Sequence, residues 1–520
     1  MSEVFDKRLR ALAETPGDLF AGGLRGVEKE CLRIAPTGRL STKPHPRGLG
    51  SALTNRFITT DYSEALLEFV TPAFASTWEA LRCVTDIHQF TYKQLDDELL
   101  WPSSMPCLLP AEKDIPLARY GSSNVGQMKT IYRRGLGHRY GRQMQTISGV
   151  HFNYSLPPAF WAKYRDIVCM DCNEDHVRSS QYLGLVRNFR RFGWIVLYLF
   201  GSSPAVCRSF GDDLGMPMLN ENTWYEPYGT SLRMSDLGYS NQNQERINIS
   251  LNSLDEYVQD LSTAINTVVP EYEAIGVKVD GVWQQLNANL LQIENEYYSP
   301  IRPKRVARSG ERPTTALQRG GIEYVEIRSL DINLFDPSGI NQNTMRFMEA
   351  FLVYCLLEDS PYFDDDALAE VKRNHTATAK YGRDPNLRLL RDSREISLRK
   401  WAGHIVERVL AVAALIDRDE GGDSYVQAVT SLNSLVEEPE NTPSARMIAE
   451  LRDADSSFFE YTLGMARSHR DYFDVIASMP EARRIELQTE AADSLRRQAE
   501  IEAADDVGLD DYLAAYFSRD

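Results

Sequence analysis

The segment RGVEKECLRI, residues 25–34, places the strongest limit on what this chain can fold into. Two glutamates, Glu28 and Glu30, stand two residues apart in an extended-looking stretch flanked by arginines. On a β-strand, residues i and i+2 project to the same side. Two carboxylates held this close repel each other unless a cation or a basic group lies between them. The segment therefore predicts a strand whose acidic face meets a positive charge.

The same spacing recurs at Glu326 and Arg328 in GGIEYVEIRSLDIN and at Glu294 and Glu296 in QIENEYYSPIRPKR, which we also interpret as strands. Glu68, like Glu326, lies in an otherwise apolar run, where an unpaired carboxylate is costly to bury. Mg²⁺ takes oxygen ligands, usually carboxylates together with waters and phosphates. We predict that acidic strands surround a metal and nucleotide site, although each carboxylate alone also fits a solvated face. The candidates are Glu28, Glu30, Asp61, Glu64, Glu68, Glu294, Glu296 and Glu326.

Two further patterns offer partners for such a site. In MQTISGVHFNYSL, alternation puts His151 and Asn153 on one strand face, where a neutral imidazole can join carboxylates as a metal ligand or remain a hydrogen-bonded core residue. The segment IRPKRVARSGE carries Arg302, Lys304 and Arg305, which suit the phosphates of a nucleotide because arginine makes bidentate contacts. A basic loop paired with the acidic surface is the alternative.

Composition and absent motifs exclude several classes. A formal charge of −17 argues against nucleic acid or an anionic membrane as the main partner. The N-terminus lacks a signal-peptide core, and the longest apolar run, residues 194–200, is far below the roughly 20 residues that span a bilayer, so we expect a cytoplasmic protein. P-loop, dinucleotide-binding, zincin and nucleophile-elbow motifs are absent from the sequence. Cys169 and Cys172 form a single C-x-x-C with no second pair for a closed zinc site, and we interpret them as ordinary cysteines.

Apolar periodicity predicts helices over residues 4–15, 77–99, 181–200 and 254–266. Beyond about residue 340 helical periods dominate, over residues 341–358, 397–416, 444–466 and 480–504. We expect a catalytic sheet-and-helix core over residues 1–340 and a helical part over residues 341–520 packed on it as one compact unit. Residues 120–135, YGSSNVGQMKTIYRRG, are expected to form a loop that closes over the site.

Seven motifs, taken in order, resemble those of the bacterial glutamate–cysteine ligases (γ-glutamylcysteine synthetases): RGVEKECLR, TTDYSEALLEF, WPSSMPC, QTISGVHFNYSLP, TSLRMSDLGY, QIENEYYSPIRPKR and RGGIEYVEIRSLDIN. The resemblance covers residues 20–335. It implies an α+β fold with a curved, mainly antiparallel sheet like that of the glutamine synthetase catalytic core, flanking helices and a helical C-terminal part. It also implies ATP-dependent ligation of L-glutamate to L-cysteine through γ-glutamyl phosphate, the first step of glutathione synthesis.

The resemblance assigns roles to individual residues. Glu30, Asp61 and Glu68 would hold metal on the amino-acid side, and Glu28, His151 and Glu326 would hold metal that bridges the ATP phosphates. Arg233 would bind the glutamate carboxylate, and Arg328 would stabilise the transferring phosphoryl group. Asn153 is a further substrate-site residue. The expected cysteine pocket consists of Tyr132, Tyr239, Tyr298 and Tyr62.

The implied ligands are L-glutamate, L-cysteine, ATP and Mg²⁺, with Mn²⁺ as a possible replacement, and glutathione is the implied feedback inhibitor. We expect a monomer or a weak dimer. Three other functions fit parts of the pattern: a ligase on the same scaffold with a different amine acceptor, a carboxylate-rich metal hydrolase acting on phosphate esters, and a non-catalytic metal- or nucleotide-binding protein.

Overall fold

The computed structural model describes residues 3–106, 108–238, 248–308 and 310–518. Within these residues the central sheet has seven strands in the order β11-β12-β5-β1-β3-β2, with β4 also paired to β1. All of its pairings are antiparallel. Its strands are β1 Leu24–Ile34, β2 Ile58–Thr60, β3 Leu66–Val70, β4 Leu99–Leu100, β5 Val150–Ser155, β11 Ile301–Lys304 and β12 Tyr324–Leu330. The expected α+β class with an antiparallel sheet is confirmed.

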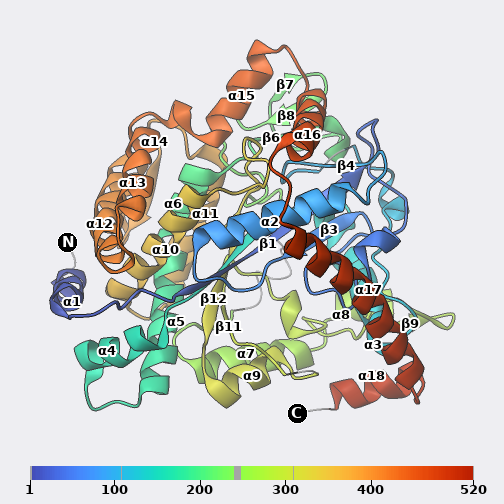
Figure 1. Cartoon of the computed structure of the whole chain (residues 1–520), viewed down its shortest axis with the longest axis horizontal. Helices are drawn as coiled ribbons and strands as arrows, with labels where there is room; N and C mark the ends of the chain where they lie inside the picture. Colours follow the sequence, from blue (N-terminus) through green and yellow to red (C-terminus); the bar gives the residue numbers. More distant parts are fainter. Residues whose placement is uncertain (1–2, 107, 239–247, 309, 519–520) are drawn as a thin grey trace.

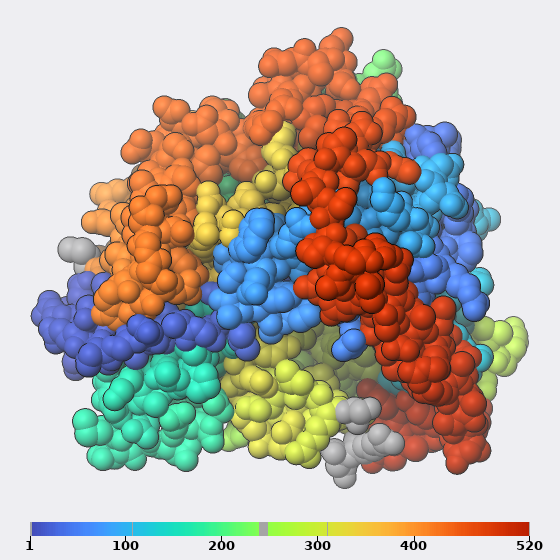
Figure 2. Space-filling view, in the orientation of Figure 1, coloured from blue at the N-terminus to red at the C-terminus, as the bar shows by residue number. Residues whose placement is uncertain are grey.

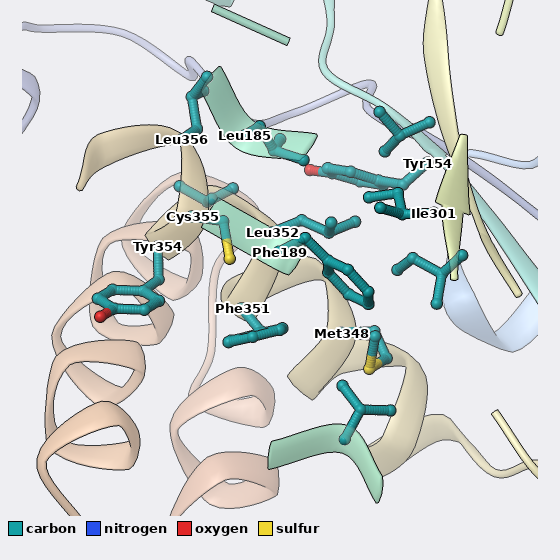
Figure 3. Close-up of a cluster of buried hydrophobic side chains, with 14 of the residues drawn as sticks. Tyr154, Leu185, Phe189, Ile301, Met348, Phe351, Leu352, Tyr354, Cys355 and Leu356 are labelled. Carbon is teal, nitrogen blue, oxygen red and sulfur yellow. The ribbon is translucent and has the colours of Figure 1, made fainter. Parts of the chain in front are cut away.

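One face of this sheet is apolar and packs on helices. Phe152 of β5 and Ile327 of β12 are fully buried and belong to a hydrophobic cluster with residues of α5 and α10. Figure 3 shows Tyr154 and Ile301 from the sheet facing Phe189 of α5 and Met348 of α10. Because neighbouring residues in a strand point to opposite faces, this packing leaves the acidic positions on the other face.

Short polar side chains define where several helices begin. Ser76, Ser123 and Asn341 accept backbone N–H groups in the first turns of α2, α3 and α10, as N-cap residues do. The helices of the first 340 residues are α1 Glu3–Glu14, α2 Thr77–Tyr92, α3 Asn124–Tyr140, α4 Pro158–Cys169, α5 Glu174–Phe192, α6 Trp194–Phe200, α7 Leu254–Asn266, α8 Pro270–Ile275 and α9 Pro313–Gly320.

Several expectations for this part of the chain differ from the structure. The single helix expected over residues 181–200 is divided at Gly193 into α5 and α6. The helix expected to reach residue 99 ends at Tyr92, and a turn that includes Asp96, with φ 46°, leads from there to β4. The loop expected over residues 120–135 is mostly α3, a helix. Small two- and three-stranded sheets complete the region, with strands β6 Ala205–Cys207, β7 Met218–Asn220, β8 Thr223–Tyr225, β9 Lys278–Val279 and β10 Val282–Trp283.

The last third of the chain is helical apart from one hairpin, β13 Arg388–Arg391 with β14 Arg394–Ser397. In Figures 1 and 2, α17 runs across α2 on the near face of the molecule. Each of the four helices expected here is present, with the segment expected over residues 444–466 divided into α15 and α16. The helices are α10 Gln342–Leu357, α11 Asp365–Tyr381, α12 Leu398–Glu420, α13 Ser424–Ser431, α14 Asn433–Glu437, α15 Pro443–Asp453, α16 Phe458–Val475, α17 Glu481–Ala504 and α18 Leu509–Phe517.

Among the helices of the described residues, none is both long and apolar enough to cross a membrane. Cys169 and Cys172, interpreted as ordinary cysteines, form a disulfide with their Cα atoms 5.5 Å apart, a separation within the usual range for such a bond. The end of α4 brings the two residues together before α5 begins.

Candidate active site

Strand register places the predicted acidic residues on the face of the sheet opposite the apolar core. In β1, Glu30 lies opposite Glu68 of β3, and Glu28 lies opposite His151 of β5. Glu326 of β12 lies next to Asn153 across the β5–β12 pairing. Directly opposed residues in an antiparallel pair point to the same face. The two-residue spacing in separate segments therefore becomes one continuous polar surface.

Three of these side chains converge closely. His151 Nδ1 lies 3.1 Å from Glu28 Oε2 and 3.5 Å from Glu326 Oε1. One ligand atom from each of the three lies within 4.8 Å of the other two. Asn153 donates from Nδ2 to Glu28 Oε1 at 2.9 Å and so orients that carboxylate. Two carboxylates and an imidazole at this separation form a donor set that fits one divalent cation.

A second acidic group lies beside the first. Gly149 donates its backbone N–H to Glu30 Oε2 at 2.6 Å, and His151 Nε2 is 3.9 Å from Glu30 Oε1. Burial raises the pKa of Glu68 well above its usual value, and the neighbouring carboxylates Glu28, Asp61 and Glu30 raise it further. Burial likewise raises the pKa of Glu30. Carboxylates crowded in this way favour a bound cation, which relieves their repulsion.

Basic side chains complete the same surface. Arg328 donates from Nη1 to Glu326 Oε1 at 2.9 Å, and Lys304 Nζ lies 3.2 Å from Glu326 Oε2. Burial tends to raise the pKa of Glu326, but Lys304, Arg328 and His151 outweigh it and hold the pKa well below its usual value. Glu326 is therefore an anion at the boundary between acidic and basic groups.

These groups line one cavity of about 650 Å³. Its wall includes most of the predicted site residues, brought together from strands β1, β3, β5, β11 and β12, from α3 and from the segments between them. The predicted residues that line it are Glu28, Glu30, Asp61, Glu68, Tyr132, His151, Glu296, Tyr298, Arg302, Lys304, Glu326 and Arg328.

Other predicted residues lie elsewhere. The Tyr62 side chain packs in a hydrophobic cluster behind the wall. Arg233 is buried and donates from Nη2 to the backbone carbonyl of Arg328 at 2.7 Å. Arg305 donates to the carbonyl groups of Gly320 and Gly321, at the end of α9. Tyr239 lies outside the described residues.

The comparisons with known proteins agree with this geometry. The family model described as glutamate-cysteine ligase matches residues 9–378. A glutamate–cysteine ligase from Alcanivorax borkumensis is 46% identical and covers 98% of this chain and 99% of its own length. One from Pseudomonas aeruginosa is 44% identical, with 99% and 98% covered. The chain belongs to the glutamate–cysteine ligase family. Membership makes it an ATP-dependent ligase.

Solved structures support the same fold. The crystal structure of glutamate–cysteine ligase from Francisella tularensis in complex with AMP has a TM-score of 0.90 and 36% identity, and the match covers 96% of this chain and 98% of that one. A bifunctional glutathione synthetase from Pasteurella multocida has a TM-score of 0.71 at 23% identity. The match covers 90% of this ligase but 54% of the Pasteurella chain, and this likeness concerns the fold alone.

Three acidic residues of this ligase that were grouped with the metal candidates have other partners: Glu64 and Glu294 lie off the cavity wall, whereas Glu296 lines the cavity but pairs with Arg139. Glu294 and Glu296 lie in a short 3₁₀ turn, not a strand. The Glu296 carboxylate accepts from Arg139 Nη1 at 3.0 Å and from the Tyr140 hydroxyl at 2.5 Å, while the Glu294 carboxylate accepts from the Thr314 hydroxyl. Glu64 accepts from the backbone N–H groups of His45 and Arg119. Each of these carboxylates has a structural partner of its own.

The sequence interpretation also missed part of the cavity wall. Lys129 and Arg133 of α3 line the cavity, with Arg133 Nε donating to the carbonyl of Asp61. Burial lowers the pKa of Lys129 to about 8, and the nearby Arg133 lowers it as well. With Tyr132 and Leu136 they form an i, i+3, i+4, i+7 set on one helix face. This spacing is visible in the sequence. If residues 124–140 had been interpreted as a helix, it would have predicted that Lys129 and Arg133 share a face with Tyr132.

Proposed function

We propose that this ligase joins the γ-carboxylate of L-glutamate to the amino group of L-cysteine, as the first step of glutathione synthesis. The γ-carboxylate attacks the γ-phosphorus of ATP, which forms γ-glutamyl phosphate and releases ADP. The cysteine amine then attacks the acyl carbon, loses a proton and displaces inorganic phosphate, leaving the γ-glutamyl amide bond. The observation that carries the proposal is the position of the Glu326 carboxylate, which belongs to the donor set for a divalent cation and also contacts the cations Arg328 and Lys304.

Phosphoryl transfer depends mainly on positioning and charge neutralisation. Arg328 is placed to stabilise the charge on the transferring phosphoryl group, and Arg302 and Lys304 extend the same positive surface along β11 toward the other phosphates. Arg302 lies opposite Glu326 in the β11–β12 register, which fixes it beside the reacting group. The Francisella relative was crystallised in complex with AMP, which supports nucleotide binding by this ligase.

The carboxylates of this donor set fit Mg²⁺, and they also suit Mn²⁺. Glu28, His151 and Glu326 would hold one ion, and Glu30, Asp61 and Glu68 would hold metal on the amino-acid side. When bound, the divalent ion neutralises phosphate charge. Asn153 and the N–H of Gly149 keep Glu28 and Glu30 oriented for this purpose.

We assign the amino-acid substrates to the part of the cavity wall that α3 and Tyr298 form. Tyr132 and Tyr298 line the cavity and, by their family positions, form the cysteine pocket. Helix α3 covers this part of the cavity, which helps to keep water from the acyl phosphate. Roles for Arg233 at the glutamate carboxylate, for Tyr62 and Tyr239 in the cysteine pocket and for Arg305 at the nucleotide stay predictions.

An ADP-release assay tests this function, run with ATP and Mg²⁺ and with each amino acid omitted in turn. We expect ADP release at full rate only with both amino acids, and γ-glutamylcysteine as the product by mass. Replacement of cysteine by 2-aminobutyrate or ammonia tests the acceptor. Ammonia as the preferred acceptor, or phosphate release from simple phosphate esters without amino acids, would replace our assignment with one of the alternatives.

We further propose a cytoplasmic monomer or weak dimer that is inhibited by glutathione at the amino-acid sites. The formal charge of −17 disfavours self-association, and inhibition by glutathione is what the family resemblance implies. Competition of glutathione with glutamate in the same assay tests the inhibition.

A further inference from the structure

The C-terminal helix α18 packs against the side of α3 that faces away from the cavity. Leu513 of α18, only 2% exposed, forms a hydrophobic cluster with Met128 and Ile131 of α3 and with Leu286. Figure 1 shows α18 beside α3 at the lower right, next to the end of α17. Residues nearly 400 positions apart in sequence therefore share one small core.

Two residues connect this core to the cavity. Tyr132 and Ile293 line the cavity, and both also pack against the cluster around Leu513. Tyr132 belongs to α3, one residue after Ile131. Helix α18 therefore forms a second layer behind the wall, and Leu513 supports Tyr132 without touching the cavity.

Polar contacts fix where α18 lies. Asp510 is 2.7 Å from Lys278 Nζ and accepts from Trp283 Nε1 at 3.1 Å, and Arg312 Nη2 donates to the Tyr516 carbonyl at 3.0 Å. The Asp510 side chain is 64% exposed, so solvent screens this ion pair strongly. The buried apolar contact of Leu513 therefore determines the position of α18 more strongly than this ion pair does.

The chain that leads into α18 holds the start of α3. The backbone N–H of Asn124, the first residue of α3, donates to Asp505 Oδ2 at 2.5 Å. The Asn124 side chain donates from Nδ2 to the Val507 carbonyl at 3.0 Å. Residues 505–517 thus hold α3 at its first turn and again along its middle.

We infer that Leu513 is a positioning residue for the cysteine part of the active site. The inference rests on the proposed function, in which Tyr132 forms part of the cysteine pocket. Truncation of Leu513 leaves a gap behind α3, and the helix can then shift into it. A shift of this kind moves Tyr132, whereas the proposed metal ligands on the strands of the central sheet stay in place.

The test compares Leu513→Ala with Leu513→Met, which refills the volume. We expect Leu513→Ala to raise the KM for cysteine about tenfold, as displaced positioning groups do, and to change the KM for glutamate and ATP less than twofold. Leu513→Met should restore the KM for cysteine. Leu487→Ala in α17 is the matched control, since Leu487 is also 2% exposed and the residues of its cluster do not line the cavity; it should leave all three KM values unchanged.

Hydrogen exchange of the α3 amides provides a readout that does not depend on activity. Faster exchange over residues 128–136 in Leu513→Ala, and not in Leu487→Ala, supports the inference. An unchanged KM for cysteine in folded Leu513→Ala overturns it, as does an equal rise in all three KM values. A wild-type chain that makes no γ-glutamylcysteine overturns the proposed function instead, and the exchange result then decides whether Leu513 supports α3.

Discussion

The Glu326 carboxylate contacts an imidazole, an ammonium and a guanidinium group in the cavity. Glu326→Gln keeps the shape but removes the charge that faces His151, Lys304 and Arg328. We expect kcat to fall at least about hundredfold, a loss typical of removing one electrostatic group from an active site. The circular dichroism spectrum should stay that of the wild type.

Glu323→Gln is the matched control for this change, because Glu323 precedes the same strand but is 45% exposed. It should keep wild-type turnover. Wild-type turnover in Glu326→Gln would remove Glu326 from the machinery and would leave the acidic surface without a demonstrated role.

The two-residue spacing of charged residues correctly predicted the acidic face of the central sheet only where the segment is a strand in the structure. It succeeded for Glu28 with Glu30 and for Glu326 with Arg328, because pairing with strands distant in sequence holds β1 and β12 extended. It failed for Glu296, whose partner Arg139 lies 157 residues away. No local pattern shows that a carboxylate will be neutralised by a distant arginine, so this error was unavoidable from spacing alone.

At the scale of elements, the main difference between expectation and structure is that α3 is a helix where a loop was expected over residues 120–135. Its glycines favoured a loop, since glycine weakens a helix by about 1 kcal/mol relative to alanine. In the structure, Gly135 and Gly137 mark close approaches: a Cβ atom at these positions would overlap the Gln292 side chain and the Tyr62 hydroxyl. The helix tolerates them because packing against neighbouring segments outweighs local propensity.

The buried pair of Arg139 and Glu296 joins α3 to the segment that carries Tyr298. Both side chains are 0% exposed, and Arg139 also contacts the Tyr272 ring at 4.1 Å. Arg139→Met leaves a buried carboxylate without its cation, so we expect a loss of about 3 kcal/mol in the free energy of unfolding. Urea unfolding measures it. Arg319→Met, which breaks a surface ion pair, should change the free energy far less; equal losses in both variants would contradict the proposed importance of burial.

At the scale of the whole molecule, the sequence predicted that the last third of the chain is helical. It did not predict which residues join these helices to the central sheet. Arg25 of β1 donates from Nε to Glu349 of α10 at 2.9 Å, and the Tyr425 hydroxyl of α13 donates to the same carboxylate at 2.8 Å. Arg25 and Glu349 are each about 1% exposed. Such a contact joins segments 324 residues apart, and neither RGVEKECLRI nor the α10 sequence alone reveals the other as its partner.

This triad gives a test of the prediction that residues 1–340 and 341–520 form one unit. Burial lowers the pKa of Arg25, but the attraction of Glu349 outweighs burial and shifts it upward, so the guanidinium stays charged. Glu349→Ala leaves that charge to the partly exposed Glu420 carboxylate, 3.4 Å away, and we expect a loss of about 3 kcal/mol in the free energy of unfolding. The double variant Arg25→Met with Glu349→Leu should recover much of it, because an apolar pair of similar volume often replaces a buried ion pair at little cost.

The same denaturation experiment reports on cooperativity. If the two parts unfold together, tryptophan fluorescence and loss of ligase activity follow one transition in the wild type and in Glu349→Ala, displaced to lower denaturant in the variant. The pair connects β1, which carries Glu28 and Glu30, to α10, so loosening the helical part should also release the acidic strand. Two separate transitions in the wild type, with activity lost in one of them only, would show that the parts fold independently and that the buried pair joins two domains.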